Sequence, residues 1–291
     1  MDYVGAIYRP PSEAGSLLLQ VTVGCSHDRC TFCGMYAGKT FRPKPWETIQ
    51  ADIAEARTAG PWTRRVFLCD GDALVLATDR LLTILREIRT QLPWIERVGV
   101  YGDPRGLRHK SDEDLGRLRA AGLGIVYNGQ ESGDDEVLRR IDKRFDAAEA
   151  VEMGRRLALA GIRHSVIVLL GIAGIAGSQR HAQESARILS AIDPAFASAL
   201  TVTLVPGTRL HQEHERGQFQ LPDRFALLGE LRTLLAGTRL TSCLFSSNHA
   251  SNYLPLQGHL PEAQGRLLQL LDEVLRTRDE RWLRPEHLRG L

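Results

Sequence analysis

Three of the five cysteines in this chain stand within nine residues of one another. Cys25, Cys30 and Cys33 form the pattern C-x4-C-x2-C, whereas Cys69 and Cys243 stand alone. Thiolates that converge from one short loop favour a soft metal, either zinc or the iron of an iron–sulfur cluster. The odd number and uneven spacing of the cysteines argue against a disulfide framework and favour a reducing compartment, so we expect a cytoplasmic protein.

The fourth ligand would distinguish three kinds of metal site. A zinc site usually has four protein ligands, and His27 is the nearest candidate, although it would crowd the loop between Cys25 and Cys30. A plant-type [2Fe–2S] centre has the same spacing and a later fourth cysteine, which would be Cys69, although Cys69 stands in an apolar strand-like run. A [4Fe–4S] cluster with only three cysteines leaves one iron open to bind a substrate or cofactor.

Strand-like and helix-like segments alternate along most of the chain. The predicted strands cover residues 16–24, 64–71, 96–103, 124–133, 163–172 and 196–208. The predicted helices cover residues 45–60, 78–92, 111–122, 147–161, 178–192 and 222–237. This alternation indicates parallel strands joined by right-handed crossovers. We therefore predict an α/β fold, a partial (β/α)6 TIM-type barrel, with an open doubly wound sheet as the alternative.

A C-terminal extension follows the six repeats. The extension is predicted to contain a strand at residues 240–247, a polar loop at 245–262 and a helix at 261–282. We therefore predict a barrel domain at 1–238 and an extension packed on it at 239–291. We expect the loop to act as a substrate lid, because loops between ordered elements often carry binding residues. The candidate substrate contacts are His249, Ser251, Asn252 and Tyr253.

Chemically distinctive residues follow several of the predicted strands. In both candidate folds, function lies at the carboxyl ends of parallel strands. The residues found there are Cys25, Asp70, Gly71, Asp72, Asp103, Glu131, Gly171 and Pro206. We expect the strands to bring them to one edge.

The order of these features resembles the radical S-adenosylmethionine superfamily over roughly residues 16–210. The usual signature of that family is C-x3-C-x2-C after the first strand of a six-unit partial barrel, with an aromatic residue before the last cysteine, here Phe32. This chain has one extra residue between Cys25 and Cys30. The stretch ESGDDEVLRRIDK, which starts at Glu131, is similar to the subgroup of oxygen-independent coproporphyrinogen oxidases and the Elongator catalytic subunit. The resemblance implies that the three clustered cysteines hold a [4Fe–4S] cluster.

The resemblance also implies which residues bind S-adenosylmethionine. A Gly-Gly-Glu-like stretch after the second strand holds its amino group, here Asp70, Gly71 and Asp72. A polar residue after the fourth strand binds the ribose, here Glu131 and Ser132. The adenine lies near the ends of the fifth and sixth strands, here Gly171, Val205 and Pro206. Acidic side chains suit the amine and the hydroxyl groups, and glycine allows close approach of the backbone.

The implied activity is reductive cleavage of S-adenosylmethionine to a 5′-deoxyadenosyl radical, which abstracts hydrogen from an unknown substrate. A 3-amino-3-carboxypropyl radical is the other outcome of cleavage. An external one-electron reductant such as flavodoxin or ferredoxin would be the partner. A non-catalytic iron–sulfur electron-transfer or regulatory protein is the alternative function, and a zinc-stabilised barrel is the third.

The remaining composition excludes some other classes of protein. The chain has 37 basic and 35 acidic residues and a net charge of +2, without a basic patch that would indicate nucleic-acid binding. No apolar run approaches the ~20 residues of a membrane span, and no signal peptide is visible. We expect Cys69 and Cys243 to be buried as small apolar residues.

Overall fold

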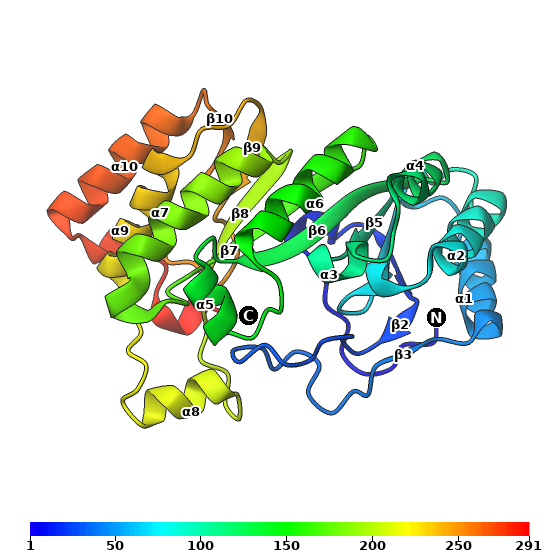
Figure 1. Ribbon diagram of the computed structural model, residues 1–291, viewed down its shortest axis with the longest axis horizontal. Coiled ribbons are helices and arrows are strands. Elements are labelled where there is room, and N and C mark those ends of the chain that lie inside the picture. Colours follow the sequence, from blue (N-terminus) through cyan, green and yellow to red (C-terminus); the bar gives the residue numbers. More distant parts are fainter. Residues whose placement is uncertain (291) are drawn as a thin grey trace. The chain divides into compact units, whose positions relative to one another are not determined.

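The computed structural model describes residues 1–290, which divide into two compact units (Figure 1). Unit 1 contains Met1–Asp28, Met35–Asn128 and Arg155–His164, and unit 2 contains Arg29–Gly34, Gly129–Gly154 and the chain from Ser165 on. The boundary passes through the cysteine loop. Cys25 therefore belongs to unit 1, and Cys30 and Cys33 belong to unit 2.

Unit 1 is built on parallel strands in the order β1-β4-β5-β6. These are β1 (Leu17–Gln20), β4 (Arg65–Cys69), β5 (Arg97–Tyr101) and β6 (Leu123–Glu131), of which the last three residues belong to unit 2. The short strands β2 (Thr22–Val23) and β3 (Arg42–Pro43) form a separate antiparallel pair. Phe67 and Val100 are fully buried, as expected for parallel strands that helices cover.

The helices of unit 1 follow its strands. They are α1 (Trp46–Ala59), α2 (Thr78–Gln91), α3 (Pro104–Leu107) and α4 (Asp112–Ala120), with 3-10 turns η1 (Pro11–Glu13) and η2 (Ala73–Val75). Helix α1 packs on β1 and α2, and α2 packs on α4 (Figure 1). Helix α4 begins with a capping box, in which Ser111 and Asp114 each accept a hydrogen bond from the other's backbone N–H.

Unit 2 continues the alternation of strands and helices. Its strands are β7 (Arg163–Leu170, whose first two residues belong to unit 1), β8 (Phe196–Thr201), β9 (Cys243–Ser246) and β10 (Gln257–Leu260), in the order β7-β8-β9-β10. The first three are parallel, and β10 is antiparallel to β9. The carboxyl ends of β7 and β8 lie side by side, because Leu170 pairs with Thr201.

The helices of unit 2 surround these strands. They are α5 (Asp135–Arg140), α6 (Ala147–Leu159, which ends in unit 1), α7 (Gly174–Ile192), α8 (Arg209–Glu215), α9 (Arg224–Gly237) and α10 (Gln264–Thr277), with 3-10 turns η3 (Glu280–Trp282) and η4 (Glu286–Leu288). Helix α7 packs on α9, and α9 packs on α10 (Figure 1). None of the helices between residues 1 and 290 is both long and apolar enough to cross a membrane.

The predicted α/β class is confirmed, but several elements differ from the prediction. The short elements β3, α3, α5 and α8 were not predicted. The first predicted strand, 16–24, is divided into β1 and β2. The predicted loop at 245–262 contains strand β10, whose partly exposed residues lack an apolar alternation. Strand β10 forms because Leu260 and Gln257 pair with the two ends of β9, a long-range contact that local sequence does not encode. The division at residues 238 and 239 stays a prediction.

A buried histidine near the start of β7 makes stability depend on pH. His164 is buried, and both of its ring nitrogens lack a hydrogen-bond partner. Burial lowers the pKa of His164 to about 4, whereas an unfolded chain has a histidine pKa of about 6.5. The unfolded state therefore binds the proton first as the pH falls below about 6.5, and this contribution to stability is lost progressively down to about pH 4.

We expect His164→Leu to reduce this pH dependence. Between pH 7.5 and pH 5, the free energy of unfolding of the native protein should fall by about 2 kcal/mol more than that of the variant. Urea unfolding of both proteins at the two pH values measures the difference. An equal fall in both proteins would contradict the assignment.

Candidate functional site

Cys25 stands just after β2, next to the turn that ends β4. Its thiol is partly exposed. Burial raises the pKa of Cys25 above its ordinary value, and hydrogen bonds from the backbone of Asp28 and His27 offset part of this rise. A surface hollow of about 370 Å³ borders the same loop and is lined in part by Cys25, His27 and Lys39. The thiol is therefore close to solvent on one side and to β4 on the other.

Cys30 and Cys33 are held by unit 2. The Cys33 N–H donates to the Cys30 carbonyl at 3.1 Å, which closes a turn between them. Thr31 between them donates its N–H to the Ile141 carbonyl at 3.2 Å and accepts from the Leu210 N–H at 2.8 Å. Phe32 packs on an apolar cluster that includes Ile141 and Leu210. In residues 1–290, no three or more histidine, cysteine, aspartate or glutamate side chains lie together as a ready-made metal site.

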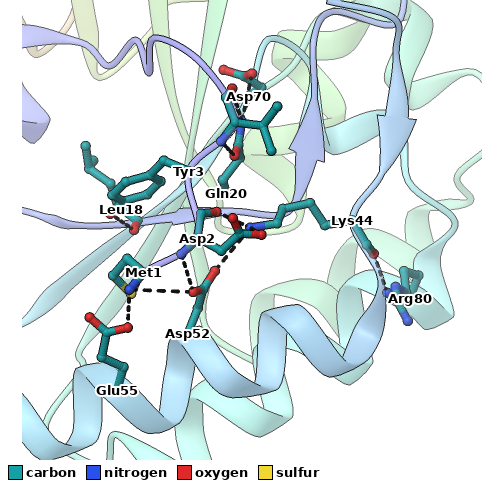
Figure 2. Close-up of polar contacts among 11 residues, drawn as sticks. Met1, Asp2, Tyr3, Leu18, Gln20, Lys44, Asp52, Glu55, Asp70 and Arg80 are labelled. Carbon is teal, nitrogen blue, oxygen red and sulfur yellow. Dashed lines mark hydrogen bonds and ion pairs between the residues drawn. The ribbon is translucent and has the colours of Figure 1, made fainter.

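Asp70 begins the turn after β4, and its carboxylate is fully buried. One oxygen, Oδ2, accepts hydrogen bonds from Gln20 Nε2, Gly24 N and Lys39 Nζ, each at 3.1 Å. Figure 2 shows Gln20 beside Asp70, and the Val4 N–H in turn donates to Gln20 Oε1 at 2.8 Å. The other oxygen of Asp70, Oδ1, has no hydrogen-bond partner. A buried acceptor without a partner is costly, so it marks a place where a ligand could donate.

Gly71 brings this turn against Cys25. A Cβ atom at position 71 would lie 2.7 Å from Tyr36 Cε2 and 2.9 Å from Cys25 Cβ, closer than real Cβ contacts allow. Its N–H donates to the Gly24 carbonyl at 3.2 Å. The structure therefore brings two predicted site residues, Cys25 and Gly71, into direct contact. Tyr36, which sequence reasoning missed, forms the wall of this contact.

Asp72 is the third residue of the turn and is also buried. Its Oδ2 accepts from Ser26 Oγ at 2.7 Å, and its Oδ1 has no hydrogen-bond partner. Burial, followed by the negative charge of Asp103, raises the pKa of Asp72 to about 7. Asp103 is held in turn by Arg105, whose Nε donates to Asp103 Oδ2 at 2.9 Å.

Ser26, Asp103 and Arg105 thus join the candidate site. The prediction from the sequence placed Asp103 at the end of a strand but gave it no function. It gave no function to Ser26 or Arg105 either. An arginine two residues after a strand-end aspartate was the signal that could have found the pair, because the two side chains can reach each other across the start of α3.

Glu131 ends β6, Ser132 follows it, and the two residues, both in unit 2, have different environments. Glu131 has a backbone φ of +62°, a left-handed conformation that is uncommon for residues other than glycine. Its partly buried carboxylate lies 3.3 Å from Lys143 Nζ. Ser132 is fully buried, and its Oγ contacts His181 Nδ1 at 2.8 Å and accepts from the Asp134 N–H at 3.0 Å. The Ser132 hydroxyl group is therefore engaged in hydrogen bonds inside the protein, whereas the Glu131 side chain is partly exposed.

The two predicted adenine-binding segments lie next to each other, because the Val202 N–H donates to the Leu170 carbonyl at 2.9 Å. Gly171 has a φ of +82°, which favours glycine, and its N–H donates to Glu230 Oε1 at 2.7 Å. The Val205 carbonyl already accepts from Thr208 N at 3.1 Å and from Thr208 Oγ1 at 2.7 Å. Pro206 is exposed.

The predicted substrate loop is tied to the carboxyl end of β8. Asn252 Nδ2 donates to the Ala199 carbonyl at 2.7 Å, and its Oδ1 accepts from Thr201 Oγ1 at 2.8 Å. Ser251 Oγ accepts from the Thr201 N–H at 3.1 Å. Both side chains are buried. They therefore shape the loop next to the 202–206 segment.

His249 and Tyr253 occupy the more exposed part of this loop. The Ser251 N–H donates to His249 Nδ1 at 3.1 Å, so that nitrogen is an acceptor and the neutral ring carries its proton on Nε2. Tyr253 donates its hydroxyl to Glu286 at 2.7 Å, and the Arg289 guanidinium stacks on its ring at 4.0 Å. His249 is thus partly exposed, and its Nδ1 is engaged by Ser251.

The radical SAM superfamily domain matches residues 19–182, more than half of the chain. The chain therefore belongs to the radical SAM superfamily, a class of enzymes that pair a [4Fe–4S] cluster with S-adenosylmethionine. The family, enzyme class and cofactors predicted from the sequence are confirmed at the level of the superfamily. No curated protein matches the chain in sequence.

Solved structures of radical SAM enzymes share the fold. The methyltransferase TsrM from Kitasatospora setae, with cobalamin and a [4Fe–4S] cluster bound, has a TM-score of 0.56 and 19% identity over 69% of this chain and 37% of its own. Coproporphyrinogen III oxidase (HemN) from Escherichia coli has a TM-score of 0.55 and 15% identity over 76% of this chain and 51% of its own. Elp3 from Methanocaldococcus infernus has a TM-score of 0.52 and 11% identity over 91% of this chain and 63% of its own.

These likenesses confirm the partial-barrel fold, and HemN and Elp3 are among the structures that share it. The chain spans less than two thirds of the length of each of these structures. At such low identity they inform on the fold alone.

Proposed function

We propose that this protein is a radical S-adenosylmethionine enzyme whose Cys25, Cys30 and Cys33 hold a [4Fe–4S] cluster with one open iron. When bound and reduced, the cluster would supply the electron that cleaves a carbon–sulfur bond of S-adenosylmethionine and so starts radical chemistry on a substrate. The observation that carries the proposal is the pair of buried, unpartnered carboxylate oxygens of Asp70 and Asp72 in the turn that touches Cys25.

The donor chemistry fits an iron–sulfur cluster. None of the five cysteines, all within the described part of the chain, forms a disulfide, and the three clustered ones are partly exposed. Thiolates are the ligands that such clusters use. Cys69 and Cys243 are buried, and burial raises the pKa of Cys69 well above its ordinary value and that of Cys243 to about 12. Three ligands without a convincing fourth favour the open-iron cluster over zinc and over a [2Fe–2S] centre.

The unpartnered oxygens fit the amino group of S-adenosylmethionine. An ammonium group donates up to three hydrogen bonds and carries the charge that a buried carboxylate needs. Asp70 Oδ1 and Asp72 Oδ1 would accept from it, and Gly71 would keep the turn close to Cys25. Gln20 and Lys39 already occupy the other oxygen of Asp70, so they would hold its carboxylate in one orientation.

The ribose and adenine contacts follow from the ends of β6 to β8. Glu131 is partly exposed in a left-handed conformation and would accept from ribose hydroxyl groups, whereas Ser132 is engaged in the interior. The backbone at Gly171 and the Val205–Pro206 segment would face the adenine. Because the Val205 carbonyl is already occupied by Thr208, contact there would use the Val205 side chain or N–H.

The proposal also includes how the protein would contact its substrate and receive its electron. The 239–291 extension would act as the substrate lid on the 1–238 barrel, with His249 as the side chain that reaches the substrate from a loop shaped by Ser251, Asn252 and Tyr253. A flavodoxin or ferredoxin in the cytoplasm would supply the electron. The hollow beside Cys25 and Lys39 is where we expect it to approach.

Anaerobic reconstitution tests the function. We expect the reconstituted protein to hold about four irons per chain, and dithionite reduction to give a [4Fe–4S]⁺ electron paramagnetic resonance signal that changes on addition of S-adenosylmethionine. Product analysis should then detect 5′-deoxyadenosine, or methylthioadenosine if the other carbon–sulfur bond breaks. A [2Fe–2S] signal, or a reduced cluster whose signal S-adenosylmethionine leaves unchanged, would rule the proposal out.

A further inference from the structure

A group of polar side chains, all buried except the partly buried Ser178, lies next to the residues that follow β6 and β7 in unit 2. We call it the His181 cluster, and its members are Ser132, Ser178, His181, Ser185 and Glu230. His181, Ser178 and Ser185 come from α7, Glu230 comes from α9, and Ser132 follows β6. Two ionisable groups in an interior cost free energy unless they are well paired, so their presence calls for an explanation beyond packing.

Glu230 connects this cluster to the turn after β7. Its Oε1 accepts from the Gly171 N–H at 2.7 Å, and its Oε2 accepts from Ser178 Oγ. Oε1 also lies 3.4 Å from His181 Nε2. Burial raises the pKa of Glu230 to about 7 and lowers that of His181 to about 4. The histidine is therefore neutral at pH 7, and burial favours the protonated form of the carboxyl group more than in an exposed glutamate.

His181 connects the cluster to the turn after β6. Ser132 Oγ accepts the Asp134 N–H at 3.0 Å, so its own hydroxyl hydrogen is available to donate to His181 Nδ1 at 2.8 Å. With Nδ1 as an acceptor, the neutral imidazole carries its proton on Nε2, which lies 3.4 Å from Glu230 Oε1 without forming a hydrogen bond of good geometry. The Gly133 N–H donates to Ser185 Oγ at 2.9 Å. This is a second hydrogen bond between the cluster and the turn after β6.

Both turns contain a residue in a left-handed conformation, Glu131 at φ +62° and Gly171 at φ +82°. The left-handed conformation is uncommon for Glu131 and persists only where the surroundings hold it, and the His181 cluster contacts Ser132 and Gly133 next to it. At Gly171, where glycine adopts this conformation readily, the cluster accepts the backbone N–H directly. We propose that His181 and Glu230 are positioning residues that set the backbone of the 131–134 and 171–174 turns for binding of S-adenosylmethionine. This inference rests on the proposed function, which assigns the ribose and adenine contacts to these turns.

The test compares Glu230→Ala with Glu230→Gln. We expect Glu230→Ala to weaken binding of S-adenosylmethionine to the reconstituted protein by about tenfold or more, because the Gly171 N–H loses its acceptor. Iron content should not change. Glu230→Gln keeps an acceptor of the same shape and should restore affinity to within about threefold of the native protein. Equilibrium dialysis with labelled S-adenosylmethionine gives the affinities.

Hydrogen exchange separates positioning from a purely structural role. In cofactor-free protein, Glu230→Ala and His181→Asn should speed amide exchange in residues 131–134 and 171–174 beyond any general rise. His164→Gln is the matched control, because this equally buried histidine lies in unit 1 and should change neither affinity nor exchange in the two turns.

Two results would overturn the inference. One is a Glu230→Ala protein that is less stable yet keeps native affinity and native exchange in both turns. The other is a Glu230→Gln protein that is as impaired as Glu230→Ala. If the native protein itself fails to bind S-adenosylmethionine, the proposed function fails instead. In that case, amide exchange in residues 131–134 and 171–174 that is the same in the variants as in the native protein would also show that His181 and Glu230 do not position these turns.

Discussion

Alanine at Cys25, Cys30 or Cys33 is expected to abolish the [4Fe–4S] cluster and with it all cleavage of S-adenosylmethionine. With only three protein ligands, the loss of one leaves two thiolates, too few to retain the cluster. Iron content should fall from about four atoms per chain to fewer than one, and the charge-transfer absorption of the cluster should disappear. Iron and sulfide assays with visible spectra after anaerobic reconstitution measure both effects.

The isolated cysteines provide the matched controls. Cys243→Ala removes a buried thiol on β9, away from the cysteine loop in sequence, and should leave iron content unchanged. Cys69→Ala separates the open-iron cluster from a [2Fe–2S] centre, because only the latter needs Cys69 as its fourth ligand. Loss of iron in Cys69→Ala, or full iron content in all three cysteine-loop variants, would contradict the assigned ligands.

Two substitutions of Asp70 should distinguish its contribution to the stability of the turn after β4 from its contribution to cofactor binding. Asp70→Ala removes the acceptor of the Gly24 N–H and the charge partner of the partly exposed Lys39, whose ammonium keeps the Ala6 carbonyl as an acceptor. Loss of the acceptor of a buried N–H costs about 1–3 kcal/mol of unfolding free energy. Asp70→Asn keeps an acceptor oxygen for Gln20, Gly24 and Lys39, and should cost far less. It places an amide at the unpartnered position, however, where it would repel an ammonium donor.

We therefore expect Asp70→Asn to fold, to hold its cluster and to lose at least about tenfold in affinity for S-adenosylmethionine. Chemical unfolding and equilibrium dialysis measure the two effects. Asp52→Ala is the matched control, because Asp52 is a buried carboxylate 3.2 Å from Lys44 in the same unit (Figure 2). It should lose stability without a specific change in affinity. Native affinity in Asp70→Asn would remove Asp70 from the cofactor site.

Local patterns were sufficient for most helices and strands. The expected helix at 45–60 is Trp46–Ala59, and the one at 147–161 is Ala147–Leu159. Regular apolar spacing and end signals such as Ser111 encode these elements within a few residues. Strand β10 was missed because it depends on pairing with β9. Helices α3, α5 and α8 were missed because they have only 4, 6 and 7 residues, too few to show a clear periodic pattern.

Some parts of the candidate site could likewise be predicted from local sequence, and others could not. The C-x4-C-x2-C spacing and the Asp-Gly-Asp stretch are each contiguous in sequence, so residue order alone reveals them. The contributions of Ser26, Lys39 and Arg105 depend on which residues meet after folding. The loop residues Ser251 and Asn252 look equally suited to substrate in sequence, yet they are buried against β8.

The sequence by itself determined the α/β class, the radical SAM family and the three-cysteine motif, because these depend on residue type and spacing along the chain. Only the tertiary structure decided which polar atoms remain without partners. Asp70 and Asp72 belong to a residue type that is common on protein surfaces, but burial leaves one oxygen of each unpartnered in a turn whose Gly71 lies against Cys25. His181 and Glu230 stand 49 residues apart and meet only because α7 packs on α9. Burial and long-range contact are properties of the whole fold, and no local pattern encodes them.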